Sequence, residues 1–148
     1  MSNLENIINE AWENKDQVDP NSDQSLKDAI NQVINDLDSG KSRVAEKING
    51  EWKTHQHLKK AIMLSFRVYE NDILSGPYSV WRDRQNLLKG KTAGWTKEEF
   101  EKAGFRMVPN SPVRKGSFVG KDAVLMPCYV NIGAYIGAKT MMDTFSRA

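Results

Sequence analysis

The last quarter of the chain repeats with a period of six residues, and this repeat constrains the fold more than any other feature. From residue 118 the sequence divides into FVGKDA, VLMPCY, VNIGAY, IGAKTM and MDTFSR. The first position of every hexad is apolar, and these residues are Phe118, Val124, Val130, Ile136 and Met142. The residues at the fifth position are Asp122, Cys128, Ala134, Thr140 and Ser146, and four of these five are small. A period of six matches neither the turn of an α-helix nor the alternation of a strand.

The period instead predicts a triangular solenoid, in which each hexad forms one short strand and three hexads complete one coil. We therefore expect the large apolar residues Val124, Val130, Ile136 and Met142 to point into the prism. The small residues are expected near the corners, where a larger side chain would collide with the next coil. Cys128 occupies one of these small positions, and this role outweighs that of a catalytic thiol because no histidine lies near it in sequence.

The first part of the chain predicts helices. Apolar residues recur at spacings of three and four over residues 4–12 and again over residues 24–39, which is typical of amphipathic helices. Gly40 follows the second segment, where a left-handed residue commonly ends a helix. We expect one core between these two helices, made by Leu4, Ile7, Ile8, Val33, Ile34 and Leu37.

A hairpin and a third helix are expected next. RVAEKI and EWKT flank Asn49-Gly50, a pair that tolerates the positive φ values of a tight hairpin turn. HLKKAIML, residues 57–64, predicts a helix, and the alternating LSFRVY, residues 64–69, predicts an extended segment after it. Residues 71–95 carry scattered glycines and predict a long ordered loop, which is either a functional loop or a plain surface connection.

The two parts of the chain meet near residue 110. Thr96 and Glu99 form a capping box, which predicts a short helix that ends before Gly104. Pro109 and Pro112 then mark a junction. We expect an α+β protein with an N-terminal helical cap domain, residues 1–110, that contains a β-hairpin. Residues 111–148 are expected to form the first, incomplete coils of a hexapeptide-repeat solenoid.

Composition argues for a globular protein without a nucleic-acid or membrane partner. The charged fraction is 27% but the net charge is only +2, with acidic and basic residues intermixed. No apolar run approaches the roughly 20 residues of a membrane span. The single cysteine and the acidic, amphipathic N-terminal segment MSNLENIINEAWENK favour a cytoplasmic protein. His55 and His57 have the spacing of a possible metal pair, but a surface role is the favoured reading, so no metal site is predicted.

Three stretches together resemble one enzyme family. They are NQVINDLDSGKSRVAEKINGEWKTHQHLKKAIMLSFRV, then GFRMVP, then VLMPCYVNIGAYIGAKTMMDT. In order and spacing they resemble the tetrahydrodipicolinate N-succinyltransferases, from residue 1 to about Thr144. The resemblance implies a left-handed parallel β-helix, a homotrimer, and no cofactor. It also implies the transfer of a succinyl group from the co-substrate succinyl-CoA to the amino group of the ring-opened dicarboxylate, in lysine and diaminopimelate biosynthesis.

The resemblance also implies two site residues. Arg106 of the GFR motif and Asp143 of the DT motif match the family's substrate-binding positions, and Asp143 is the catalytic candidate. A guanidinium matches a carboxylate with two parallel hydrogen bonds, and a carboxylate can orient an amine and accept its proton. From the residues alone, a surface arginine and a corner aspartate bonded to its own backbone are the simpler interpretations. Arg114 is a weaker second candidate for binding a carboxylate.

The end of the chain departs from this resemblance, because family members continue through many more hexads. The resemblance places the CoA groove, a second catalytic acid and most of the trimer interface beyond residue 148. The sequence is thus interpreted as a truncated family member, expected to lack measurable succinyl transfer by itself. The alternatives are a non-catalytic cap domain that acts as an oligomer-interaction module and, less favoured, a hexapeptide acyltransferase with another acceptor.

Overall fold

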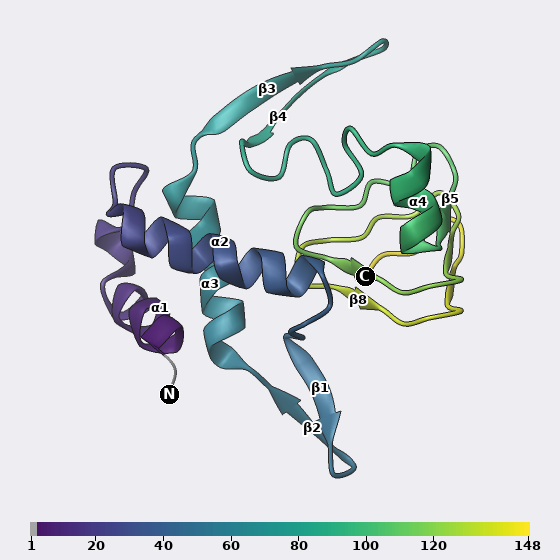
Figure 1. Ribbon diagram of the computed structural model, residues 1–148. Helices are drawn as coiled ribbons and strands as arrows, with labels where there is room; N and C mark the ends of the chain where they lie inside the picture. Colours follow the sequence, from purple (N-terminus) through teal and green to yellow (C-terminus); the bar gives the residue numbers. More distant parts are fainter. Residues whose placement is uncertain (1–2) are drawn as a thin grey trace.

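A computed structural model describes residues 3–148 of the chain, with helices at one side and a coil of short strands at the other (Figure 1). The helices are α1 (Asn3–Glu13), α2 (Gln24–Asp38) and α3 (Gln56–Val68), with a short 3₁₀ turn, η1 (Lys15–Gln17), after α1. Each helix buries one apolar stripe against the other two. This cluster contains all six residues predicted for the core, with Ile8, Val33, Ile34 and Leu37 buried and Leu4 and Ile7 partly buried.

Helix α3 is longer than the sequence predicted, and the extended segment expected at residues 64–69 is wrong. The helical stripe continues through Leu64, Ser65 and Val68, all of them buried. Ser65 is tolerated on this stripe because its hydroxyl donates a hydrogen bond to the carbonyl of Ile62, at 2.7 Å. The apparent alternation of residues 64–69 therefore arises from two polar residues: Ser65, which bonds within the helix, and Arg67, which donates to the carbonyl of Lys15, at 2.7 Å.

The predicted hairpin is confirmed. Strands β1 (Ala45–Ile48) and β2 (Glu51–Thr54) pair in antiparallel fashion around Asn49 and Gly50. The φ values of these two residues are 51° and 89°, as a type I′ turn requires.

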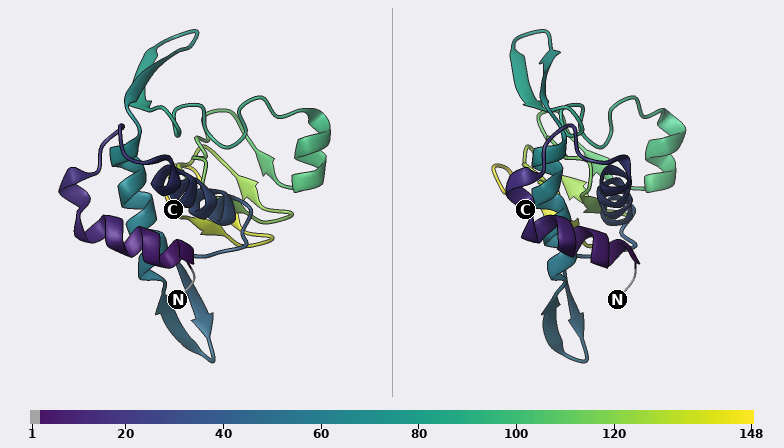
Figure 2. Two further views of the ribbon diagram at one scale, coloured as in Figure 1. Left: turned by 60° about the vertical axis from the view of Figure 1, so that its left-hand side comes forward. Right: turned by 90° about the vertical axis from the view of Figure 1, so that its left-hand side faces the viewer.

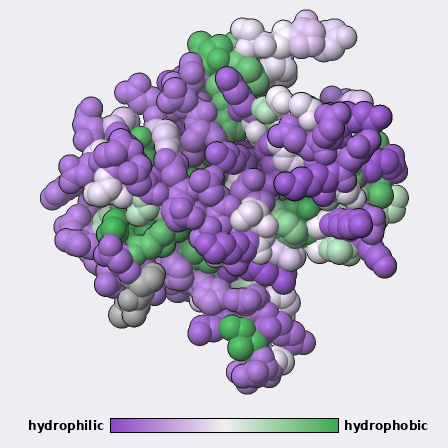
Figure 3. Space-filling model, in the orientation of Figure 1, coloured by the Kyte–Doolittle hydropathy of each residue, from purple (hydrophilic) through white to green (hydrophobic). Residues whose placement is uncertain are grey.

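A second hairpin replaces the long loop predicted for residues 71–95. Strands β3 (Asn71–Ser75) and β4 (Val80–Arg84) pair in antiparallel fashion, and only the residues after them form irregular turns. The sequence pattern hid this hairpin because its apolar residues are exposed, so that no buried face produces an alternation. The two hairpins project from opposite ends of the molecule (Figures 1 and 2). Both carry exposed apolar side chains, which include Ile48 and Trp52 on the first hairpin and Ile73 on the second. Figure 3 shows hydrophobic surface, in green, at both ends of the molecule.

The short helix α4 (Lys97–Ala103) begins and ends as predicted. Thr96 accepts a hydrogen bond from the backbone N–H of Glu99, whose carboxylate accepts one from the backbone N–H of Thr96. Gly104 ends the helix in the left-handed conformation, with φ of 72°. This turn directs the chain from the helix into the first strand of the coil.

Five short strands build the coil: β5 (Arg106–Met107), β6 (Phe118–Val119), β7 (Val124–Leu125), β8 (Tyr135–Ile136) and β9 (Met141–Met142). Strands β5, β7 and β9 form one parallel ladder, and β6 and β8 form a second. Isolated parallel bridges, Val113 with Val130 and Tyr129 with Arg147, mark a third side. The predicted parallel strands are therefore present, and the chain passes through three sides in each coil.

One of the repeats is shorter than the others. Arg106 pairs with Val124, and so the first coil contains three full hexads. Val124 pairs with Met141, and the step along the chain from one partner to the other is one residue short of three hexads. The other paired positions whose connection includes residues 125–128 have the same shortened spacing. The chain loses this position at the turn around Met126 and Pro127, between β7 and the next side of the coil.

The missing position changes which side chains point inward. Val130 and Ile136 are buried in the coil as predicted, and Met142 packs against the same cluster. The prediction for Val124 is wrong, because Leu125 is fully buried there and Val124 is only half-buried. Counting strictly in sixes back from Val130 therefore assigns the inward-facing position to the residue one before the correct one, throughout the part of the coil that precedes the short repeat. For the same reason Ala123, not Asp122, fills the small buried position.

The helices and the coil share a tightly packed junction. The carboxylate of Asp38, at the end of α2, accepts a hydrogen bond from the N–H of Gly116, at 2.7 Å, and forms an ion pair with Lys91, at 2.8 Å. Ile132 of the coil belongs to the core of the helices. Among residues 3–148, no helix is both long and apolar enough to cross a membrane.

Candidate functional site

Arg106 lies on the outer face of the ladder formed by β5, β7 and β9. Its backbone N–H donates to the carbonyl of Ala123, at 2.9 Å, which fixes β5 beside β7. Phe105 before it is buried and Met107 after it packs into the coil, so Arg106 points outward and is exposed. Within residues 3–148 the guanidinium makes no ion pair or side-chain hydrogen bond, and its charge is available to a ligand.

Asp143 lies on the same outer face, immediately after β9. The N–H of Met126 donates to the carbonyl of Met142, at 3.0 Å, and this bond holds the end of β9 beside β7. Met142 packs inward, so Asp143 points outward and is exposed. Its Oδ1 atom accepts a hydrogen bond from the N–H of Thr144, at 2.7 Å, which is the backbone contact expected of a corner aspartate. This contact leaves Oδ2 open to solvent.

The ladder places these two predicted site residues on one face without bringing them into contact. Arg106 is two strands away from Met141, and Asp143 is two residues beyond Met141. From ordinary strand spacings, the Cα atoms of Arg106 and Asp143 are roughly 12 Å apart. A ligand that touches both side chains must therefore extend across β7, the strand between them.

A cavity of about 570 Å³ lies beside Arg106, between α4 and the coil. Val124 forms part of its wall on the ladder, and Lys97 and Glu101 line it from α4. These two α4 side chains form an ion pair with each other, at 3.6 Å. Of the two basic side chains that line this cavity, Lys97 is therefore paired, and Arg106 has no acidic partner within residues 3–148.

Arg114 is engaged elsewhere. Its guanidinium forms a close ion pair with Asp83 of β4 and lies 5.9 Å from the centre of the Tyr129 ring. The side chain is about four-fifths buried, with 21% exposed. The structure therefore ties Arg114 to the second hairpin and does not bring it to the face that carries Arg106 and Asp143.

The two histidines lie on the other side of the molecule, near the first hairpin. His55 contacts the carboxylate of Glu46, at 2.7 Å, and His57 that of Glu5, at 3.6 Å. No cluster of three or more potential metal-ligating side chains occurs in residues 3–148. Each imidazole is 23% exposed and contacts a carboxylate of another secondary-structure element.

Cys128 is buried among apolar side chains of the coil, with 5% of its surface exposed. Burial raises the pKa of this thiol above its ordinary value, because the thiolate would lose its hydration. A thiol that is buried and neutral is a poor nucleophile, which agrees with the predicted structural role.

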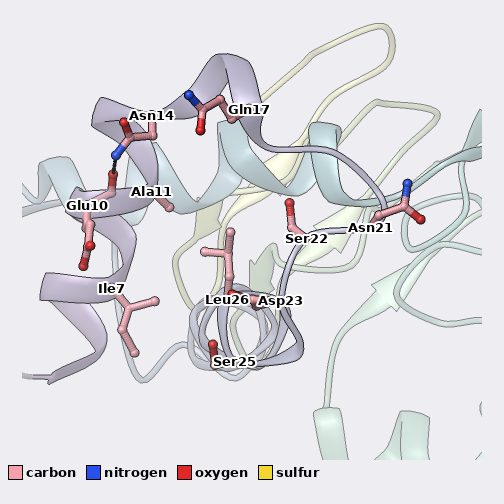
Figure 4. Close-up of a pocket in the computed structure, with 10 residues that line it drawn as sticks. All are labelled: Ile7, Glu10, Ala11, Asn14, Gln17, Asn21, Ser22, Asp23, Ser25 and Leu26. Carbon is pink, nitrogen blue, oxygen red and sulfur yellow. Dashed lines mark hydrogen bonds between the residues drawn. The ribbon is translucent and has the colours of Figure 1, made fainter.

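A further cavity, of about 440 Å³, opens between α1, η1 and the beginning of α2, and it was not predicted from the sequence (Figure 4). Its lining is mostly polar: Ile7, Glu10, Ala11, Asn14, Gln17, Asn21, Ser22, Asp23, Ser25 and Leu26. The amide of Asn14 donates to the carbonyl of Glu10, at 3.2 Å, across one turn of helix. None of the elements that form this cavity contributes to the ladder that carries Arg106 and Asp143.

Comparison with known proteins places the chain in a family. A family model described as "Tetrahydrodipicolinate N-succinyltransferase N-terminal" matches residues 3–68, which is the part from α1 through α3. A protein of Pelagibacter ubique named 2,3,4,5-tetrahydropyridine-2,6-dicarboxylate N-succinyltransferase is 66% identical over 136 residues, which cover 92% of this chain. The chain belongs to the tetrahydrodipicolinate N-succinyltransferase family.

Other proteins of this succinyltransferase family are also similar to this chain over almost its whole length. Proteins of the same name from Dechloromonas aromatica and Sodalis glossinidius are 51% and 48% identical, over 96% and 99% of this chain. The alignments cover 50% of the Pelagibacter protein, 51% of the Dechloromonas protein and 53% of the Sodalis protein. The chain thus spans about half the length of the curated relatives it matches.

Proposed function

We propose that this chain supplies the dicarboxylate-binding part of an enzyme that transfers a succinyl group from succinyl-CoA to ring-opened tetrahydropyridine-2,6-dicarboxylate. The main support is the shared name of relatives that align along more than nine-tenths of the chain. The placement of Arg106 and Asp143 on one face adds to it. Such a reaction belongs to lysine and diaminopimelate biosynthesis in the cytoplasm. The family name favours this enzyme over a non-catalytic interaction module.

In the proposed reaction, Arg106 binds one carboxylate of the acceptor through two parallel hydrogen bonds. The acceptor amine must be neutral when it attacks the thioester. Asp143 orients this amine through a hydrogen bond and accepts a proton as the C–N bond forms. The thioester C–S bond breaks, and CoA leaves as the thiolate, which is then protonated. The step requires no metal or cofactor besides the co-substrate.

The proposed architecture of the whole enzyme extends the coil. The parallel ladders, and a step of about three hexads from each strand to its partner, support a parallel β-helix of hexapeptide repeats. Its proposed left-handed sense rests on the family resemblance. A homotrimer is the proposed assembly. In this arrangement the helical part caps the coil, and the outer face with Arg106 and Asp143 borders the site.

The test uses an extended protein, in which this chain continues into the C-terminal half of the Pelagibacter ubique relative. We expect release of free CoA thiol to require both succinyl-CoA and the cyclic dicarboxylate, and to persist after treatment with a chelator. Acceptor-independent release alone would contradict the proposed function. Failure of succinyl transfer in a folded, trimeric extended protein would favour the interaction module.

Arg106→Lys in the extended protein tests the proposed carboxylate contact. We expect KM for the dicarboxylate to rise about tenfold, the equivalent of ~1.4 kcal/mol, because an ammonium cannot reproduce the bidentate fork. The KM for succinyl-CoA is expected to stay within twofold of the original value. Steady-state kinetics with each substrate varied in turn decides the outcome, and an unchanged KM for the dicarboxylate contradicts this role of Arg106.

A further inference from the structure

Apolar side chains occupy the outer face of the ladder between Arg106 and Asp143. Val124 of β7 and Met126, the residue after β7, point outward. On β9 the outward residue is Met141. Met141 is 64% exposed, although the neighbouring Met142 packs into the coil. Met141 shares the outer face of this ladder with the unpaired Arg106, with β7 between them, and its exposed side chain has no role in the core of the coil.

We propose that Met126 and Met141 form an apolar floor that contacts the hydrocarbon chain of the acceptor and selects its length. This inference rests on the proposed function and adds a specificity site to it. Arg106 holds one end of the acceptor and Asp143 contacts the amine at the other end. The methylene groups between them cross β7, where Met126 lies one strand from Asp143 through the bond between its N–H and the carbonyl of Met142.

The chemistry of the acceptor fits such a floor. Opening the ring of tetrahydropyridine-2,6-dicarboxylate leaves a linear seven-carbon diacid, which is polar at its ends and apolar in the middle. Methionine has an unbranched, polarisable side chain that adapts to a flexible hydrocarbon. A shorter diacid spans less of the distance between Arg106 and Asp143, which lie on strands two positions apart in the ladder.

Kinetics of the extended protein provides the first test. We expect Met141→Ala and Met126→Ala each to raise KM for the acceptor roughly tenfold, as lost contacts with one or two methylenes do in other enzymes. Both kcat and KM for succinyl-CoA are expected to change less than twofold. Met141→Leu, which keeps an apolar side chain of similar volume, restores most of the affinity. Met63→Ala is the matched control, because Met63 is also exposed, at 47%, but lies on α3.

Binding without turnover provides a second test that does not depend on succinyl transfer. The extended protein is labelled with ¹³C at its methionine methyl groups and titrated with heptanedioate, and the signals are assigned by Met126→Leu and Met141→Leu. We expect the methyl signals of Met126 and Met141 to shift at saturation and that of Met63 to remain in place. Pentanedioate, two carbons shorter, is expected to shift them at least tenfold more weakly at equal concentration.

The outcomes separate the two proposals. Shifts at Met126 and Met141 in a protein without transferase activity support the floor and contradict the proposed function. Succinyl transfer with unchanged KM in both alanine variants, or with signals that ignore heptanedioate, overturns the floor and leaves the proposed function standing. Equal responses to the five- and seven-carbon diacids overturn the selection of chain length.

Discussion

The helical part and the coil derive their order from different contacts. In the helices, residues three or four apart form one stripe, and the stripes of α1, α2 and α3 share a core that includes Ile8, Ile30 and Leu64. In the coil, order comes from backbone pairing between positions about three hexads apart, and the strands themselves are very short. We therefore expect the helical part to tolerate little change in its core, whereas outward side chains of the coil can change with little effect on its packing.

From this comparison we expect the largest effect on activity from a substitution on the outer face of the coil. In the extended protein, Asp143→Asn is expected to lower kcat by about 10²–10⁴, because an amide cannot accept the proton of the attacking amine. Thermal stability should change little, since Asp143 is exposed. Release of CoA thiol under saturating substrates is the measurement. Asp72→Asn is the matched control, because Asp72 is also exposed and also accepts the N–H of the next residue, at 2.8 Å. Original rates in Asp143→Asn rule out the proposed role.

The core of the helical part should give the largest effect on stability. Ile34 is 3% exposed in the cluster shared by the helices. We expect Ile34→Ala to lower the free energy of unfolding by about 2–5 kcal/mol, through lost burial and the remaining cavity. Ile34→Val, which removes one methyl group, should cost about 0.5–1.5 kcal/mol. Urea unfolding followed by circular dichroism measures both. A loss below about 0.5 kcal/mol for the alanine variant would show that the residue behaves as a surface position.

The junction between the two regions should give an intermediate effect. Gly133 has a φ of 85°, and a Cβ atom there would lie 2.8 Å from Cδ1 of Ile62 on α3. We expect Gly133→Ala to lower the free energy of unfolding by about 1–3 kcal/mol, through backbone strain and this contact. Gly50→Ala is the control for strain alone, because Gly50 also has positive φ, at 89°, and no atom within 4 Å of its Cβ position. Equal losses in the two variants would show that the junction has room to adjust.

The smallest effect concerns the interior of the coil and depends on pH. Burial raises the pKa of the Cys128 thiol, so the folded state retains this proton to higher pH than the unfolded state does. The contribution of the protonated thiol to the free energy of unfolding is fully present below the pKa of an unfolded thiol, about 8.5. It is lost as pH rises from there towards the higher pKa of the folded state. Between pH 7.5 and 9.5 we expect the original protein to lose more stability than Cys128→Ala, by no more than about 1.4 kcal/mol. Parallel urea unfolding of both proteins measures this difference, and identical pH dependence contradicts a titrating buried thiol.

Residue-level patterns predicted the helical part well and the coil only in part. The stripe that contains Ile8, Ile34 and Leu37 repeats over a few turns, so local sequence reveals which face is buried. The capping box at Thr96 and the Asn49-Gly50 turn are likewise local, and both occur as predicted. The coil was predicted as a class of structure, but Leu125 rather than Val124 points inward. A count of six cannot detect a residue omitted at a turn, because only pairing with the neighbouring coil establishes the register.

The candidate site shows the same division. The GFR and DT motifs selected Arg106 and Asp143 only through the resemblance to the succinyltransferase family, because the residues alone favoured a surface arginine and a corner aspartate. Their common face, the partner that holds Arg114, and the exposure of Met141 were decided by the tertiary structure. The physical reason is distance along the chain: ladder pairing brings together strands a full coil apart, and the ion pair of Arg114 joins it to Asp83 of an earlier hairpin. Helix periodicity, by contrast, acts over three or four residues and can be read directly from the sequence.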